Sequence, residues 1–347
     1  MTQPFASIPS FVDDVEKIIE AAYIKMGKPI GVKVRGKVKD RTRIIRKRER
    51  ERIRIVGEFI CNYLRTILHG FPRLEELHPF YRELADVLIG VQNLKKALSK
   101  VYWGLKLIEK LTSDYTRQTK LIYSVEDARE IKREYFGRVA SILRKISDSI
   151  KILAEARRKL RKIPDIDVNA PSIVIAAAPN VGKSTFVGKV STAKPEIAEY
   201  PFTTKGLILG HVKVREDLII QIIDTPGLLD RPLQERNKIE MQAILALKHI
   251  ADVIIFLVDP TFHSGYTLEY QLRILRDIMR TFPNIPLIVA LNKIDVAKKE
   301  EIEKASAELV KMGIEKVFAI SALKGKGVED LLKEAIKVAI SRRNIRM

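Results

Sequence analysis

Hydrophobic residues recur every three or four positions through most of the first half of the chain. This spacing places them on one face of a helix. Three such series occupy residues 53–67, 84–105 and 131–153. Because each helix would carry an apolar stripe that needs a partner, the pattern predicts an all-α helical bundle that begins near Arg46 and ends near Arg161.

The second half has a different rhythm, in which short β-branched runs alternate with helical patterns. The predicted strands cover residues 172–177, 207–214, 218–224, 253–259, 287–292 and 317–321. Strands connected through helices usually form parallel sheets. We therefore predict an α/β domain with a mostly parallel sheet and helices on both faces.

The boundary between these two regions is marked by Pro164 and Pro171, which bracket a polar segment. A chain of 347 residues with 46% hydrophobic residues can bury two cores. We predict a basic helical-bundle domain over residues 1–165 and an α/β domain over residues 166–347.

Positive charge is concentrated in the first half. Residues 1–170 hold 37 Lys and Arg against 22 Asp and Glu, whereas residues 171–347 hold 26 against 21. A field of this sign attracts polyanions, such as nucleic acid or an anionic membrane face. A highly charged extremophile surface would explain the number of charges but not their sign.

The densest part is the segment 33–54, which contains twelve Lys or Arg and three acidic residues. It has no Trp or Phe to anchor it in a bilayer interface, so a membrane role is the weaker interpretation. We expect it to contact the phosphate backbone of RNA, where counterion release favours binding. A solvated helix face or a disordered tail stays an alternative, and no motif for reading an RNA sequence accompanies it.

Other features narrow the class of protein. The apolar runs are too short to cross a bilayer, and no charged-then-apolar leader opens the sequence. The single cysteine, Cys61, excludes an internal disulfide, and the five histidines lack metal-ligand spacing. We expect a cytoplasmic protein, monomeric when free, with no membrane partner and no structural metal.

The segment 177–184 reads Ala-Ala-Pro-Asn-Val-Gly-Lys-Ser and lies between a predicted strand and a predicted helix. Such a loop directs backbone N–H groups at phosphates. Lys183 would reach the β and γ phosphates, and the Ser184 hydroxyl would ligate Mg2+. Short motifs of this kind also occur by chance. Ala177 stands where a glycine is usual, so we expect a strained backbone there.

Two further segments would complete the phosphate site. Asp224 ends a strand and would hold Mg2+ through water, while the amide of Gly227 would sense the γ-phosphate. Between the two motifs, Thr204 would complete the Mg2+ shell of a switch loop, with Thr203 as the alternative. A threonine-rich turn is the other interpretation of that loop.

The segment Asn292-Lys-Ile-Asp295 also lies at a strand end, and we expect it to select the base of the bound nucleotide. The Asp295 carboxylate can accept both the ring N–H and the exocyclic amine of guanine, whereas adenine has no such ring N–H. Ser321 and the two residues after it would close over the base. Four motifs in this order on these elements favour a P-loop GTPase over chance.

The nucleotide-binding residues predicted in this way are Asn180, Val181, Gly182, Lys183, Ser184, Thr185, Asp224, Gly227, Asn292, Lys293, Asp295, Ser321, Ala322 and Leu323. The predicted catalytic residues are Lys183, Thr204 and Gly227, and the predicted Mg2+ ligands are Ser184, Thr204 and Asp224.

Leu228 follows Gly227 where Ras-type enzymes have a glutamine that orients the attacking water. We therefore expect slow intrinsic hydrolysis, with the water positioned by backbone groups, a monovalent cation or a partner. Asn180 is placed to bind such a cation, with K+ the candidate, and it is equally suited to forming the turn after Pro179.

Several segments resemble the nucleolar GTP-binding protein branch of the Obg GTPase superfamily. They are Tyr-Pro-Phe-Thr-Thr-Lys-Gly at 200–206, Asp-Thr-Pro-Gly-Leu-Leu-Asp-Arg-Pro at 224–232, Glu-Arg-Asn-Lys-Ile-Glu-Met-Gln-Ala-Ile at 235–244 and His-Pro-Phe-Tyr at 78–81. The similarity spans nearly the whole chain, and 235–244 is its most specific part. The short, basic, highly charged sequence looks like an archaeal member.

The resemblance implies a switch that binds large-subunit ribosomal RNA or a pre-ribosomal particle through its helical domain, with ribosomal proteins as further partners and GTP hydrolysis as a timer. Two alternatives stay open. One is a nucleotide-sensing RNA-binding structural factor with negligible turnover, and the other is a GTPase directed at tRNA.

Overall fold

The computed structural model describes residues 4–31, 41–198, 200 and 206–345. Contacts within the chain divide it into two compact units. One contains Pro4–Glu76 and Ile89–Arg161, and the other contains Leu77–Leu88 together with the chain from Lys162 onward. The main division therefore lies a few residues before the predicted boundary, and the segment Leu77–Leu88 groups with the C-terminal unit.

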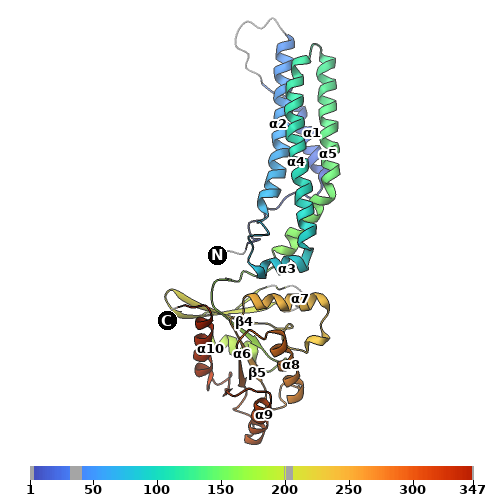
Figure 1. The fold of residues 1–347 in the computed structure, drawn as a ribbon. Helices are drawn as coiled ribbons and strands as arrows, with labels where there is room; N and C mark the ends of the chain where they lie inside the picture. The colour runs from blue at the N-terminus through green and yellow to red at the C-terminus, as the bar shows by residue number, and fades with distance from the viewer. Residues whose placement is uncertain (1–3, 32–40, 199, 201–205, 346–347) are drawn as a thin grey trace. The chain divides into compact units, whose positions relative to one another are not determined.

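The N-terminal unit is a bundle of long helices. Its helices are α1 (Val15–Gly27), α2 (Arg41–Gly70), α4 (Val91–Gln118) and α5 (Val125–Leu160), with the short η1 (Thr119–Leu121). Figure 1 shows α2, α4 and α5 running side by side, and α1 packs on α2 and α5. Most of the periodic hydrophobic residues of these helices are buried, which confirms the predicted all-α bundle.

The hydrophobic series at 84–105 is interrupted, although its spacing predicted one continuous helix. Gly90 adopts φ 74°, and this left-handed residue separates α3 (Pro79–Ile89) from α4. Glycine adopts this conformation without the steric cost that other residues meet. The break allows α3 to belong to the C-terminal unit while α4 joins the bundle.

The beginning of α5 shows how local sequence fixes an element. The Ser124 hydroxyl accepts a hydrogen bond from the Asp127 amide at 3.0 Å, and the Asp127 carboxylate accepts one from the Ser124 amide at 2.9 Å. This reciprocal capping box satisfies amides that the first helical turn leaves unpaired. The acidic side chains of this first turn also suit the positive end of the helix dipole.

A buried polar network joins three helices of the bundle. The hydroxyls of Thr112 and Tyr135 lie 2.9 Å apart, and Tyr135 donates to the Ile53 carbonyl at 3.4 Å. Gly57 on α2 lies directly against this network, because a Cβ added there would be 2.4 Å from Thr112 Cγ2. The two helices thus approach closely only because position 57 has no side chain.

Alanine substitutions at two helical glycines of this unit are expected to have opposite effects. Gly57→Ala should lower the free energy of unfolding by about 1–3 kcal/mol, since it overpacks the contact with Thr112. Gly137→Ala on α5 should raise it by about 0.5–1 kcal/mol, because no atom lies within 4 Å of its added Cβ. Urea unfolding followed by Trp103 fluorescence measures both, since the chain has one tryptophan and it lies in α4. Equal shifts in one direction would contradict the packing described.

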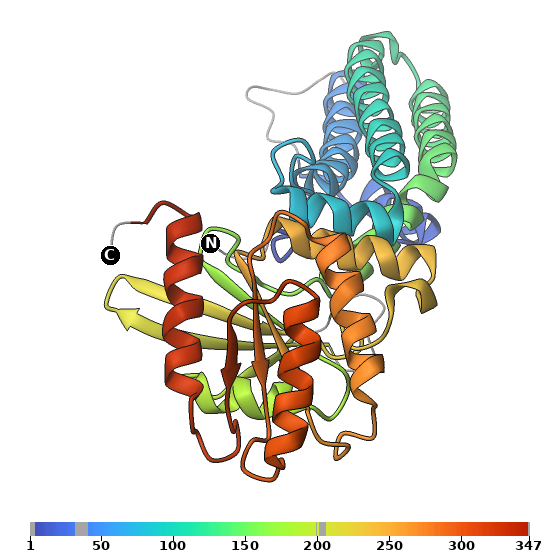
Figure 2. The ribbon, with the colours of Figure 1, turned by 60° about the horizontal axis from the view of Figure 1, so that its bottom comes forward.

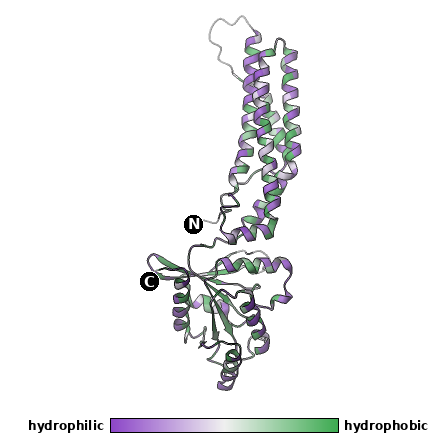
Figure 3. Ribbon diagram, in the orientation of Figure 1, coloured by the Kyte–Doolittle hydropathy of each residue, from purple (hydrophilic) through white to green (hydrophobic). Residues whose placement is uncertain are grey.

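The C-terminal unit is built on a seven-stranded sheet with the order β2-β3-β4-β1-β5-β6-β7. Its strands are β1 (Ser172–Ala176), β2 (Glu196–Ala198), β3 (Leu207–Arg215), β4 (Leu218–Asp224), β5 (Val253–Val258), β6 (Leu287–Leu291) and β7 (Val317–Ala319). The pairs β2/β3 and β3/β4 are antiparallel, and the other neighbours are parallel. The central strands are buried, and Figure 3 shows that they are hydrophobic.

Helices cover both faces of this sheet. They are α6 (Lys183–Val190), α7 (Lys238–Ala246), α8 (Leu268–Thr281), α9 (Lys299–Lys311) and α10 (Val328–Arg342), with the short η2 (Leu233–Glu235) and η3 (Leu247–His249). In Figure 2, α6 and α10 lie on one side of the sheet and α8 and α9 on the other. The predicted fold class is confirmed. No helix within the described ranges is long and apolar enough to span a bilayer.

The segment Leu77–Leu88 is tied to the rest of its unit by specific polar contacts. The Tyr81 hydroxyl donates to the Ile166 carbonyl at 2.8 Å and accepts from the Ile166 amide at 3.1 Å. The Glu83 carboxylate lies 2.8 Å from His249 Nε2 and 3.1 Å from Lys248 Nζ. These contacts explain why the segment 78–81, which carries part of the resemblance, groups with the α/β unit.

Candidate functional site

Two adjoining cavities lie where the parallel strands end, and they collect most of the predicted site residues. The larger, of about 820 Å³, is lined by Asn180, Gly182, Lys183, Ser184, Thr185 and Gly227 among others. The smaller, of about 250 Å³, is lined by Asn180, Gly182, Thr185, Asn292, Lys293, Asp295, Ser321, Ala322 and Leu323 among others. The residues expected at the phosphates and those expected at the base thus lie in adjoining spaces.

The phosphate loop turns tightly between β1 and α6. Gly182 has φ 109° and directly precedes the helix, while Asn180 has φ 60°. The ammonium group of Lys183 donates to the carbonyls of Ala177 and Ala178, at 3.0 and 3.1 Å. Because this lysine is 8% exposed, its charge is held beside the loop rather than in solvent. A phosphate in this loop would meet a lysine that is already in place.

The expected strain at Ala177 is wrong. Within the described part of the chain, the non-glycine residues with positive φ are Asn180, Lys293 and Asn344. The loop makes its left-handed turns at Asn180 and Gly182, after position 177, so Ala177 needs no special conformation. Its side chain is fully buried at the end of the first strand.

Asp224 and Ser184 form the part of the site that suits a divalent cation. The Ser184 hydroxyl donates to Asp224 Oδ2 at 2.8 Å, and the carboxylate is fully buried. Burial raises the pKa of Asp224 even though Lys183 and the Ser184 hydroxyl act to lower it. Its other oxygen, Oδ1, has no hydrogen-bond partner among the described residues. An unpaired buried carboxylate oxygen beside a hydroxyl is a donor set that fits Mg2+.

Gly227 has a positive φ of 78°. Its amide donates a hydrogen bond to Asp230 Oδ2 at 2.7 Å. The guanidinium of Arg236 donates to Gly227 O at 2.6 Å, to Leu228 O at 2.7 Å and to Asp230 Oδ1 at 3.0 Å. The predicted γ-phosphate sensor therefore has an internal carboxylate as its partner.

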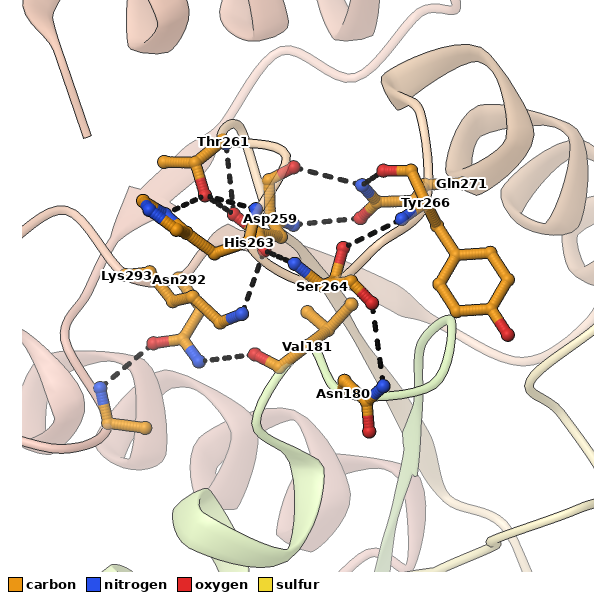
Figure 4. Close-up of polar contacts among 11 residues, drawn as sticks. Asn180, Val181, Asp259, Thr261, His263, Ser264, Tyr266, Gln271, Asn292 and Lys293 are labelled. Atoms are coloured by element: carbon orange, nitrogen blue, oxygen red, sulfur yellow. Dashed lines mark hydrogen bonds and ion pairs between the residues drawn. The ribbon is translucent and has the colours of Figure 1, made fainter. Parts of the chain in front are cut away.

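Asn292 connects the phosphate loop to the loop after β7. Its Nδ2 donates to the Val181 carbonyl at 2.8 Å, and its Oδ1 accepts from the Ala322 amide at 2.9 Å (Figure 4). Gly182 leaves room for this side chain, since a Cβ at that position would lie 2.5 Å from Asn292 Nδ2. The residue predicted from the base motif thus positions the walls of both cavities.

Asp295 lines the smaller cavity, and its surroundings stabilise the ionised carboxylate. A hydrogen bond from Ser321 lowers the pKa of its carboxyl, and Lys324, whose ammonium lies 3.8 Å away, acts in the same direction. An ionised carboxylate accepts hydrogen bonds and donates none. The ionised Asp295 therefore offers hydrogen-bond acceptors to the smaller cavity.

The loop after β5 forms a polar network that the sequence analysis did not predict. Asp259 Oδ2 accepts from the Lys293 ammonium at 2.8 Å and from the Ser264 amide at 2.9 Å, while Thr261 binds Oδ1 (Figure 4). The Ser264 carbonyl accepts from Asn180 Nδ2 at 3.4 Å. The sequence did contain a signal for this network, because Asp259 follows a short apolar run in the same way as Asp224 does.

Asn180 combines features of both roles proposed for it. Its φ of 60° is the left-handed conformation that asparagine tolerates better than most residues, as the turn role requires. Its Nδ2 group points to Ser264 and its Oδ1 points the other way, as Figure 4 shows. The oxygen that a cation would need is therefore not used by this contact.

The two candidate switch threonines, Thr203 and Thr204, lie outside the described residues. Tyr200, which precedes them, is buried, and its hydroxyl donates to the Ala243 carbonyl of α7 at 2.8 Å. Burial raises the pKa of Tyr200, with a further contribution from Glu83. The start of the candidate switch loop is therefore anchored to α7.

Comparison with known proteins agrees with this arrangement. The profile of the NOG1 N-terminal helical domain matches residues 5–167, and the profile of nucleolar GTP-binding protein 1 (NOG1) matches residues 238–295. A Methanocaldococcus jannaschii protein described as uncharacterized is 36% identical over 86% of this chain and 83% of its own length.

Eukaryotic relatives are similar over a smaller part of their length. Nucleolar GTP-binding protein 1 of Drosophila melanogaster is 37% identical over 81% of this chain and 43% of that protein. The Saccharomyces cerevisiae protein of the same name is 34% identical over 75% of this chain and 40% of that protein. A solved nucleolar GTP-binding protein 1 from Plasmodium falciparum shows 32% identity and a TM-score of 0.45, covering 52% of this chain and 92% of that one.

Proposed function

Since this chain belongs to the nucleolar GTP-binding protein 1 family, we propose that it binds GTP, hydrolyses it to GDP and phosphate, and acts as a switch in assembly of the large ribosomal subunit. The observation that carries the proposal is that Lys183 and Ser184 line one cavity, with the buried Asp224 hydrogen-bonded to Ser184 and Asp295 lining the adjoining cavity. Cationic, hydroxyl and carboxylate groups in this order match the phosphates, the metal and the guanine of one nucleotide.

Each group has a role that follows from its position. Lys183 neutralises charge on the β and γ phosphates, and its preformed contacts remove the need to reorganise during the reaction. Ser184 and Asp224 would hold Mg2+, which supplies further charge neutralisation between the phosphates when it is bound. Asn292 fixes the loops on either side of the base.

Slow intrinsic turnover is part of the proposal. Leu228 is fully buried and apolar, so the residue after Gly227 supplies no polar group to orient water. We propose that backbone groups, a K+ ion at Asn180 or a partner take this role. Phosphate release from GTP, measured in K+ and in Na+ at equal ionic strength, tests the cation. Equal rates would exclude K+, and no GDP formation under any condition would contradict the hydrolysis itself.

We propose that the partner is large-subunit ribosomal RNA or a pre-ribosomal particle in the cytoplasm, bound through the basic start of α2. Part of this segment already has partners inside the protein. Arg46 donates to the Ile122 carbonyl at 2.6 Å, and Arg54 pairs with Glu51 and Glu58 at 2.6 and 2.7 Å. Arg41 and Arg48 are exposed and stand on the same helix. These two are better placed for phosphate contacts than the paired ones.

Replacing Arg41 and Arg48 together by Gln is expected to weaken RNA binding and make it less sensitive to salt. Each lost phosphate contact lowers the slope of log affinity against log salt by roughly 0.7–0.9, so the pair should lower it by about 1.5. Filter binding of ribosomal RNA between low and moderate salt measures the slope. Arg54→Gln is the control, because its charge is engaged with two glutamates. Equal slopes in all three proteins would remove this part of α2 from the interface.

A further inference from the structure

The loop that joins β4 to η2 is held together by one carboxylate and one guanidinium. Asp230 accepts from the Gly227 amide through Oδ2 at 2.7 Å and from Arg236 through Oδ1 at 3.0 Å. Arg236 also binds the carbonyls of Gly227 and Leu228. Asp230 and Arg236 lie in two of the sequence segments that carry the family resemblance, 224–232 and 235–244, and neither was among the predicted site residues.

The Arg236 guanidinium is buried and makes its hydrogen bonds within this loop. The Arg236 side chain is 1% exposed, and burial lowers its pKa although Asp230 acts to raise it. Its Nε is buried without a hydrogen-bond partner among the described residues. A buried guanidinium needs a counter-charge. Asp230, whose side chain is 17% exposed, is the carboxylate that supplies it.

Asp230 also faces the phosphate end of the nucleotide cavity. It lines the larger cavity together with Lys183, Ser184 and Gly227. The pKa of Asp224 is raised mainly by burial, and the charge of Asp230 contributes in the same direction. The Asp230 carboxylate therefore places negative charge near the groups expected to bind Mg2+ and phosphate.

The γ-phosphate of GTP would compete with Asp230 for one donor. The Gly227 amide has a single proton, which a γ-phosphate oxygen and the Asp230 carboxylate cannot both accept in good geometry. Two anions at this point would also repel each other in a partly buried site. GDP lacks the γ-phosphate and leaves the contact between Gly227 and Asp230 intact. A side chain that interacts more favourably with the GDP-bound form than with the GTP-bound form shifts the equilibrium toward the GDP-bound form by that difference in free energy.

We propose that Asp230 stands in for the γ-phosphate on the Gly227 amide and, held by Arg236, sets the preference of this protein for GDP over GTP. The inference rests on the proposed nucleotide binding and adds a specificity-determining residue to it. GTP must displace the carboxylate from Gly227, and the loop that Arg236 holds rearranges with it. After hydrolysis, Asp230 returns to the amide and the loop closes again.

The test is the ratio of dissociation constants for fluorescent GDP and a fluorescent non-hydrolysable GTP analogue, measured on the full chain. Asp230→Asn keeps the shape and removes the charge, whereas Asp230→Ala removes both the charge and the acceptor. Asp230→Ala is expected to shift the ratio toward the GTP analogue by about tenfold, the size of one charge-assisted hydrogen bond, and Asp230→Asn should shift it in the same direction by less, because its amide oxygen can still accept. Glu235→Gln, an equal charge change at an exposed neighbouring position, should leave the ratio at the wild-type value.

Amide exchange of Gly227 gives a second measurement. In the GDP form, this amide should exchange at least tenfold faster in Asp230→Ala than in the wild type, because its acceptor is gone. Wild-type ratios and wild-type exchange in both Asp230 variants would overturn the inference while leaving nucleotide binding in place. Failure of the wild-type protein to bind either nucleotide would overturn the proposed function and the inference with it.

Discussion

Replacement of Asp295 by asparagine is expected to lower the affinity for GDP roughly a thousandfold and to create affinity for xanthosine diphosphate. In the proposed site the carboxylate would accept two hydrogen bonds from guanine, and each bond to a charged group contributes about 2 kcal/mol. An asparagine side chain offers one acceptor and one donor group, so it opposes the exocyclic amine of guanine. Xanthine carries a carbonyl there, which the amide can pair with.

Competition binding with the two diphosphates measures this exchange of specificity. Asp330→Asn makes the same chemical change at an exposed position on α10 and should affect neither affinity. Because Asp295 is ionised and lies in the smaller cavity, the loss should not depend on the phosphates. Unchanged GDP binding in Asp295→Asn would show that the base does not occupy this cavity.

Asp224→Asn is expected to lower GTP hydrolysis at least about a hundredfold while making the metal-free protein more stable. The hydrolytic loss follows from removing a charged group that would hold Mg2+, which normally supplies several kcal/mol of charge stabilisation. The gain in stability follows from removing a fully buried charge, since burial disfavours the ionised form of this carboxyl.

The pH dependence of that stability difference has a definite sign. Burial raises the pKa of Asp224 above its ordinary value of 3.8. When the pKa of a carboxyl is higher in the folded than in the unfolded protein, the group contributes stability at pH values below its unfolded-state pKa. This contribution is lost as the pH rises through its folded-state pKa. The advantage of Asp224→Asn should therefore be largest near neutral pH and shrink as the pH falls toward 4.

Calorimetric unfolding in chelator, without nucleotide, tests the stability half of this prediction. Asp217→Asn serves as the control, since that carboxylate is 76% exposed. In saturating Mg2+ and GDP the wild type should be more stable than the variant, because the wild type then gains binding free energy that the variant lacks. A variant that is less stable than the wild type at neutral pH in chelator would contradict the electrostatic account of this site.

The α/β unit was predictable because its signals are local. Each buried parallel strand is a short apolar run, and Asp224, Asn292 and Ser321 mark the ends of such runs or the residues just after them. The carboxyl ends of parallel strands meet at one edge, so their positions in sequence translate into neighbours in space. The predicted ends of these strands differ from the observed ends by at most two residues.

Other features had weak local signals or none. Strand β2 has two exposed residues and one half-buried residue, so it shows no apolar run. Helix α1 was not predicted, although Val15, Ile18, Ile19, Ala22 and Met26 follow helical spacing and are buried. Some contacts join segments that are distant in sequence or lie in loops. Examples are the association of Leu77–Leu88 with the α/β unit and the contacts of Asp230 and Asp259. Periodicity cannot report them.

Ultraviolet crosslinking with sequencing of the bound RNA, performed with a non-hydrolysable GTP analogue and with GDP, tests the central claim most directly. The account predicts reads concentrated on large-subunit ribosomal RNA with the analogue and lost with GDP. Reads on tRNA would favour a tRNA-directed GTPase, and ribosomal reads that are unchanged by nucleotide would favour a structural RNA-binding factor. Either of these results would contradict a GTP-controlled switch in large-subunit assembly.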